Sequence, residues 1–177
     1  VSLNLDSLNG VKISGRADNA LRVNWNKNAD ASGYIIEQYS NGSWNRIARI
    51  GNGSTTTYRI ENLKAGTNYQ FRIKAFGFKG AEAVYGKYVS ISGKTNPASV
   101  SGLKIGGTAK DALRLNWNTV SGAEGYIIEK YEANTWKRIA RLEGGKTGTY
   151  RAEGLKAGTN YQFRVRAFGF DGNTAIY

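Results

Sequence analysis

The chain has 177 residues, a formal net charge of +12, 40% hydrophobic residues, and neither cysteine nor histidine. This composition can fill compact cores, and it excludes disulfides, metal sites built on thiolate or imidazole ligands, and catalysis by cysteine or histidine. Apolar residues occur in short alternating runs separated by glycine-rich turns, so the sequence predicts an all-β chain without helical stripes.

The excess positive charge is spread evenly along the chain. Residues 1–92 carry 12 basic and 6 acidic groups, and residues 93–177 carry 13 and 7. No basic block or nucleic-acid-binding signature accompanies the charge, so no nucleic-acid partner is expected. No apolar stretch approaches the roughly 18 residues needed to span a bilayer, so no membrane insertion is expected. Because methionine is absent, we expect a mature or excised part of a longer precursor.

The predicted elements of the first half are β-strands in chain order. An alternating segment "VSLNL" opens the chain, and a strand is expected at about residues 8–13. Alternation then predicts half-buried strands in "ALRVNWN", "GYIIEQY", "SWNRIARI", "TYRI", "NYQFRIKAF" and "YGKYVSISG". Asn41-Gly42 is a strong two-residue hairpin signal. The second half has Asn134-Thr135 near the corresponding place, so its hairpin is expected to differ.

The second half repeats the first without a gap. Four aromatic pairs are each separated by 92 residues: Trp25 and Trp117, Tyr34 and Tyr126, Trp44 and Trp136, Tyr69 and Tyr161. About 45 of the 75 positions in residues 11–85 are identical in residues 103–177. Similarity over the length of a small domain predicts two tandem domains, at residues 1–94 and 95–177. The linker contains the only proline, Pro97, which should stiffen the joint.

A motif shared by both halves indicates a family. "LKAGTNY" ends at Tyr69 and again at Tyr161, just before the last long strand, and fits a structural tyrosine corner. With Trp25 on the second strand, each copy resembles a fibronectin type III domain. The resemblance implies an immunoglobulin-like β-sandwich of seven strands. The pattern "GYIIEQY" followed by a tryptophan and an isoleucine is similar to that of repeats in bacterial secreted and cell-surface proteins.

The two copies end differently. The first continues into its seventh strand, G, whereas the second reaches Tyr177 before that strand, so the second sandwich is predicted to lack its G strand in this chain. In one interpretation the chain is a slice of a longer array, and residues 1–7 are a leader. In the other, Val1, Leu3 and Leu5 form a donor strand that completes the second domain of a neighbour and builds a head-to-tail filament.

The acidic side chains are scattered along the sequence, and cysteine and histidine are absent. No catalytic, metal or cofactor site is therefore predicted. Glu37, Glu129, Glu61 and Glu153 are interpreted as ion-pair partners of Arg72 and Arg164. The strands expected in "GYIIEQY" and "NYQFRIKAF" and in their repeats belong to one sheet in this family, and their outward side offers a candidate interaction surface of rings beside cations. Its residues are Tyr39, Arg72, Lys74 and Phe76, repeated as Tyr131, Arg164, Arg166 and Phe168.

The sequence thus favours non-catalytic repeats of a bacterial extracellular or surface protein. We expect a stiff spacer whose partners are neighbouring domains or copies of itself. The alternative is an accessory module that binds glycan or cell-wall polysaccharide and is attached to an enzyme. Its basic surface would meet anionic wall polymers through screened attraction.

Overall fold

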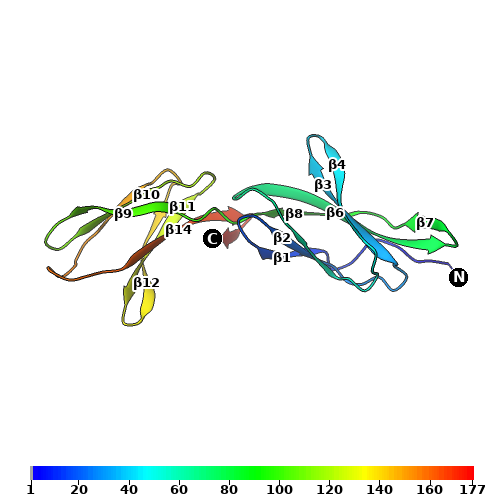
Figure 1. The fold of residues 1–177 in the computed structure, drawn as a ribbon, viewed down its shortest axis with the longest axis horizontal. Helices are drawn as coiled ribbons and strands as arrows, with labels where there is room; N and C mark the ends of the chain where they lie inside the picture. The colour runs from blue at the N-terminus through cyan, green and yellow to red at the C-terminus, as the bar shows by residue number, and fades with distance from the viewer. Residues whose placement is uncertain (1) are drawn as a thin grey trace. The chain divides into compact units, whose positions relative to one another are not determined.

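The computed structural model describes residues 2–177 and divides into two compact units. The first unit comprises Val1–Lys64 and Asn68–Thr95, and the second comprises Ala65–Thr67 and Asn96–Tyr177. Every regular element in the described residues is a β-strand, coloured from blue to red along the chain in Figure 1. No helix among residues 2–177 is long and apolar enough to cross a membrane. Each domain packs two antiparallel sheets face to face.

The first domain has a smaller and a larger sheet. The smaller sheet has the order β1 (Lys12–Arg16), β2 (Leu21–Asn24), β5 (Thr57–Ile60). The larger sheet has the order β4 (Ser43–Ile50), β3 (Gly33–Ser40), β6 (Asn68–Lys79), and the far edge of β6 pairs with both β7 (Glu82–Tyr85) and β8 (Val89–Lys94). The sequence places turn residues between these strands, so each connection between neighbours in a hairpin is short.

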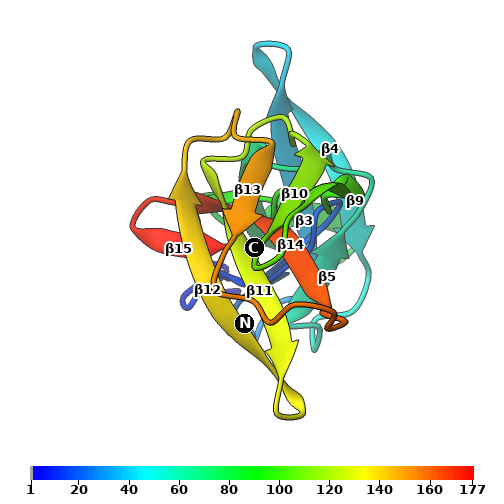
Figure 2. The same cartoon turned by 90° about the vertical axis from the view of Figure 1, so that its left-hand side faces the viewer.

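The second domain repeats this plan. Its smaller sheet has the order β9 (Ser101–Thr108), β10 (Leu113–Asn118), β13 (Thr149–Ala152). Its larger sheet has the order β12 (Thr135–Glu143), β11 (Gly125–Glu132), β14 (Phe163–Asp171), β15 (Thr174–Ile176). Figure 2 shows β12, β11 and β14 side by side.

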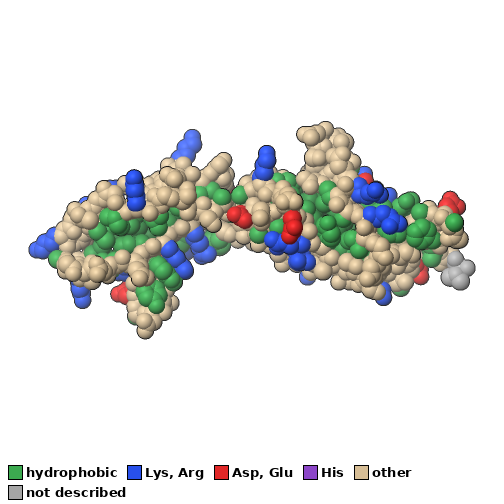
Figure 3. All heavy atoms as spheres, viewed as in Figure 1, with side chains coloured by type: hydrophobic (Ala, Val, Ile, Leu, Met, Phe, Trp, Pro, Cys, Tyr) green, Lys and Arg blue, Asp and Glu red, His purple; other side chains and the backbone are tan. Residues whose placement is uncertain are grey.

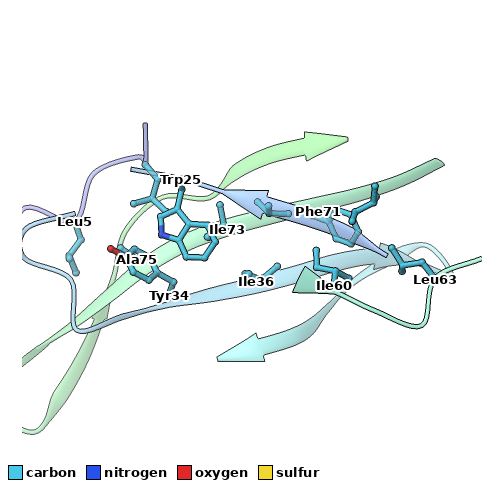
Figure 4. Close-up of a cluster of buried hydrophobic side chains, with 12 residues drawn as sticks. Leu5, Trp25, Tyr34, Ile36, Ile60, Leu63, Phe71, Ile73 and Ala75 are labelled. Carbon is cyan, nitrogen blue, oxygen red and sulfur yellow. The ribbon is translucent and has the colours of Figure 1, made fainter. Parts of the chain in front are cut away.

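The core of each domain follows from strand alternation. In the first domain Leu21 and Val23 of β2, and Trp25 directly after it, share a buried cluster with Phe71 and Ile73 of the larger sheet. Figure 4 shows Trp25, Phe71 and Ile73 in this cluster. The intervening side chains point outward. Full burial of such side chains stabilises each by roughly 1.5–3 kcal/mol, so these alternating residues carry most of the sandwich's stability.

Tyrosine hydroxyls fasten loops to this core. The Tyr69 hydroxyl accepts a hydrogen bond from the Lys64 backbone N–H at 2.7 Å, and Tyr161 does the same with Lys156 at 2.8 Å. This is the bond to an upstream backbone group that a tyrosine corner makes. The Tyr34 hydroxyl also donates to the Gly53 carbonyl at 2.9 Å.

The segment predicted as a donor strand belongs to the first domain. Leu5 is buried in that domain's core, at the end where Trp25 and Ala75 lie (Figure 4), and Leu3 packs against the same core. Val1 lies outside the described residues. A step of 92 residues aligns Leu5 with Pro97, which is also buried. The opening segment therefore corresponds to the linker that precedes the second domain, and not to strand G.

The last strand of the first domain consists of two pieces, which modifies the predicted ending of the second. β7 pairs with the end of β6, and β8 pairs with its beginning. β15 is the counterpart of β7 and pairs with β14 from Gly169 to Asp171. The second domain therefore does contain the first piece of this strand. Among residues 2–177 no strand corresponds to β8.

Candidate interaction surface

The candidate surface lies on the outer face of the larger sheet in each domain. Because Phe71 and Ile73 point into the core, Arg72 and Lys74 between and beyond them point outward. The pairing of β3 with β6 sets Glu37 opposite Arg72. The sheet register thus gathers residues from β3, β4, β6 and the last strand on one face.

Rings and cations alternate across this face in the first domain. The Arg72 guanidinium lies over the rings of Trp44 and Tyr88, 4.5 and 3.9 Å from their centroids. The Lys74 ammonium lies over Tyr88 and Tyr85, at 4.4 and 4.3 Å. We call these five residues the aromatic–cation ladder. Each contact contributes roughly 0.5–1 kcal/mol at an exposed site. The ladder therefore holds these side chains on the outer face and also stabilises the domain.

Carboxylates complete the pairing of these cations. Glu37 accepts a hydrogen bond from Arg72 Nε at 2.5 Å, and Glu129 pairs in the same way with Arg164. The predicted ion pairs of these two acids are therefore present. Glu61 and Glu153 do not join them, because each pairs instead with an arginine two residues earlier in the chain.

Two predicted surface residues are covered. Phe76 and Phe168 are buried although they lie on the outer face, because Arg49 and Arg141 lie over their rings, each 4.3 Å from the centroid. Gly33 is paired opposite Phe76, and a Cβ there would lie 2.6 Å from the ring. The absent side chain makes room for the phenyl group. Phe76 and Phe168 therefore offer no open ring to a ligand.

The remaining predicted rings are open to solvent. Tyr39 and Tyr131 are exposed, and each packs at a tilt against Trp44 or Trp136 with 5.2 Å between centroids. Tyr85 is exposed as well. Such rings provide apolar area beside charge, which suits a sugar or a protein partner.

The ladder of the second domain has a gap. Arg164 lies 4.4 Å from the Trp136 centroid and Arg166 lies 4.2 Å from the Tyr177 centroid. Among residues 2–177 no ring takes the place between these two cations that Tyr88 takes in the first domain. The side chain of Arg164 is 53% exposed, whereas that of Arg72 is 26% exposed.

Sequence reasoning missed the ladder's central ring. Tyr88 precedes the alternating segment of β8, and its outward direction could have been inferred from the inward direction of Val89 and Ile91. No group of three or more acidic, histidine or cysteine side chains in the described chain could hold a metal ion. The rings and cations of this face can contact a partner or stack on it.

A family model named fibronectin type III domain matches residues 6–89 and 98–175. The chain belongs to this family. Fibronectin type III domains are non-catalytic modules that commonly mediate protein interactions. The chain also resembles a solved two-domain fibronectin type III segment of chicken tenascin, with a TM-score of 0.51 and 18% identity. That likeness covers 96% of this chain and 94% of the tenascin chain and supports the fold.

Relatives come from animals and bacteria. The chain is 28% identical over 152 residues to the receptor-type tyrosine-protein phosphatase eta of Mus musculus, covering 79% of this chain and 12% of the relative. It is 24% identical over 177 residues to exoglucanase B of Cellulomonas fimi, covering 96% and 16%. It is 26% identical over 169 residues to chitinase A1 of Niallia circulans, covering 93% and 23%. The chain spans less than a quarter of the length of each of these three relatives.

Proposed function

We propose that the chain is a pair of non-catalytic repeats of a bacterial extracellular or surface protein and serves as a stiff spacer between other parts of that protein. The observation that supports this is that the cations on the outer face of the first domain already have partners within the same chain. There the cations already lie over rings of the same chain, and Arg72 also pairs with Glu37. Side chains engaged in this way build a stable rod segment more readily than a ligand site.

Stiffness depends on the linker. Pro97 is buried, and a Cβ on Gly169 would lie 3.7 Å from its ring, so the proline packs against the domain that follows it. We expect double-label spectroscopy to give a narrow distribution of distances between the domains, and Pro97→Gly to broaden it. An unaltered chain with a distribution as broad as that of the variant would refute the stiff spacer.

A second function is favoured by the exposed rings. Tyr85 lies beside Lys74, and Tyr39 packs against Trp44, whose ring Arg72 covers. The chain carries a net charge of +12, and two relatives are named exoglucanase and chitinase. An accessory glycan- or wall-binding module would be retained on cell wall or polysaccharide in a salt-dependent manner.

A matched pair of variants separates this function from general charge attraction. Arg72→Ala removes a charge from the candidate face, whereas Arg22→Ala removes one from β2 in the other sheet. Glycan binding at the face predicts loss of retention with Arg72→Ala and with Tyr39→Ala, and retention close to the unaltered chain's with Arg22→Ala. Equal losses for both arginines would contradict a dedicated site.

Assembly through residues 1–5 has less support. Leu3 and Leu5 would have to leave the core of their own domain before they could enter a neighbour. Deleting residues 1–5 is therefore expected to lower the stability of the first domain. A filament that disappears on this deletion, while the first domain stays folded, would restore the donor-strand hypothesis.

A further inference from the structure

Three asparagine–glycine pairs occur in the chain, and all of them belong to the first domain: Asn9-Gly10, Asn41-Gly42 and Asn52-Gly53. Asparagine is a thermolabile residue, because the backbone nitrogen of the next residue can attack its side-chain amide carbon. Glycine presents no side chain that would hinder this attack. The second domain has no such pair and serves as an internal reference. The corresponding positions, 92 residues later, are Ser101-Gly102, Ala133-Asn134 and Gly144-Gly145.

Asn41-Gly42 is the turn between β3 and β4, and its surroundings leave the asparagine accessible. Both residues are exposed, and Figure 3 shows the tip of this hairpin projecting from the first domain toward solvent. A Cβ on Gly42 would meet nothing within 4 Å. Among residues 2–177 no turn, loop or side-chain hydrogen bond is made to the side chain of Asn41 or to its backbone carbonyl. The amide and the peptide bond that follows it are therefore free to move.

The conformation of this turn suits closure of a cyclic imide between Asn41 and Gly42. Closure joins the Gly42 nitrogen to Cγ of Asn41, and the peptide plane between the two residues has to rotate to bring these atoms together. Such a rotation converts a type I′ turn into a type II′ turn, and both types fit a two-residue hairpin. Asn41 already has the positive φ that both turns require, at 52°, and glycine accepts either sign of φ. The ring can therefore close while β3 and β4 stay paired.

The other two pairs are held by hydrogen bonds on the peptide plane that would have to rotate. The Asn9 carbonyl accepts a hydrogen bond from the Asn26 backbone N–H at 2.8 Å. The Asn52 carbonyl accepts one from the Thr55 N–H at 3.1 Å, and Oδ1 of Asn52 accepts one from the Ser54 N–H at 2.9 Å. Rotation at either site breaks these bonds, so both asparagines should react more slowly than Asn41 in the folded chain.

We propose that Asn41 is a site of spontaneous modification, at which the side-chain amide is converted to a carboxylate through a cyclic imide. The Gly42 nitrogen loses its proton and forms a bond to Cγ of Asn41. The bond from Cγ to the amide nitrogen breaks, and that nitrogen takes up a proton and leaves as ammonia. Water then opens the ring. Attack of water at Cγ gives aspartate, and attack at the backbone carbonyl gives isoaspartate, in which the chain runs through the former side chain.

Both products change the candidate surface of the first domain. Each adds a negative charge at the end of the hairpin that carries Tyr39 and Trp44. Isoaspartate also lengthens the backbone of the turn by one carbon, and the two-residue turn is what sets Tyr39 opposite Trp44, whose ring lies under Arg72. The isoaspartate form should therefore lose the pairing at the end of the hairpin. The aspartate form should keep it, because the sequence Asp-Gly also suits this turn.

Incubation of the whole chain at mildly alkaline pH and body temperature, followed by peptide mapping with mass spectrometry, tests the proposal. We expect the two acid forms to accumulate at Asn41 about tenfold faster than at Asn9 or Asn52, because those two sites must first lose a backbone hydrogen bond. The same chain in concentrated guanidinium chloride is the control. There the three pairs should react at comparable rates, since only the fold distinguishes them.

Two variants of the turn separate the chemistry from the fold. Gly42→Asn should slow the reaction at Asn41 severalfold, because the added side chain hinders the attack. The turn accepts this residue, since Asn134 occupies the equivalent position with φ of 63°. Asn41→Asp supplies the charge of the product without lengthening the backbone. Hydrogen exchange of peptides that cover residues 38–46 should be unchanged in Asn41→Asp and faster in chain enriched in isoaspartate.

The proposal fails on any of three results. The first is no conversion at Asn41 in the folded chain under conditions where the unfolded chain reacts. The second is conversion at Asn9 or Asn52 as fast as at Asn41. The third is an unchanged rate at Asn41 in the Gly42→Asn variant, because the backbone nitrogen of residue 42 would then not be the attacking group. Unaltered exchange of residues 38–46 in the isoaspartate form would contradict the effect on the hairpin.

Discussion

The two hairpin turns of the larger sheets allow a reciprocal test of backbone strain. Between β3 and β4 the turn residues are Asn41 and Gly42, with φ of 52° and 80°. Between β11 and β12 they are Ala133 and Asn134, with φ of 51° and 63°. Both turns need two left-handed residues, as in the type I′ hairpin. Alanine is poorly suited to that region, whereas asparagine and glycine adopt it readily.

Exchanging the turn residues should therefore change stability in opposite directions. The left-handed region costs a residue with a Cβ roughly 1–2 kcal/mol, and asparagine recovers part of this. The double variant Ala133→Asn, Asn134→Gly is expected to stabilise the second domain by about 1 kcal/mol. Asn41→Ala with Gly42→Asn should destabilise the first domain by a similar amount. Steric contact does not confuse the comparison at Gly42, because a Cβ there would meet nothing within 4 Å.

The assay must resolve the domains, because each contains two tryptophans and fluorescence would report on both. Hydrogen exchange in graded urea, measured on peptides from each domain, gives separate free energies of unfolding. The backbone argument fails if the second domain's stability is unchanged or lower while exchange shows its hairpin intact. It also fails if the change appears in the unaltered domain.

Three further substitutions test contacts in the first domain by urea unfolding. Tyr88→Ala removes the ring beneath Arg72 and Lys74 and should lower the free energy of unfolding by about 1–2 kcal/mol. A loss that becomes smaller in high salt would contradict close stacking and indicate charge attraction that salt screens. Tyr69→Phe deletes the corner hydrogen bond and should cost about 1 kcal/mol, and no change would show that water replaces the bond. Gly33→Ala places a Cβ 2.0 Å from a backbone carbonyl oxygen and should cost about 3 kcal/mol or more; a neutral effect would contradict the close approach.

Features that depend on local pattern could be predicted from the sequence. Alternation identified the strands and assigned their inward and outward faces, because a two-residue period is a property of each strand alone. The exception is the first strand, which was expected at about residues 8–13 and lies at Lys12–Arg16. The gap-free repeat with Trp25 and the corner residues Tyr69 and Tyr161 indicated the family that the comparison shows. The ion pair of Glu37 with Arg72 also followed, since both residues alternate outward on strands expected to be neighbours.

Features that depend on register could not be predicted. Phe76 alternates outward, yet it is buried because its partner is Gly33 and Arg49 lies over it. Arg49 stands beyond a shift in the pairing of β3 with β4, between Ile36 and Glu37, that no single-strand pattern reveals. The second hairpin was misplaced for another reason. The 92-residue step aligns Asn41-Gly42 with Ala133-Asn134, one residue before the expected Asn134-Thr135, and the paired residues place the turn there.

The two copies show that identical residues need not offer the same surface. Arg72 and Arg164 occupy equivalent positions and pair with equivalent glutamates, but the first also lies over Tyr88, just before the adjoining strand β8, and the second is twice as exposed. The difference arises from the neighbouring strand, since the arginine, its acid and its tryptophan are unchanged. A contact role inferred for one copy therefore does not transfer to the other by alignment. The contribution of these arginines to binding should be measured separately in each domain.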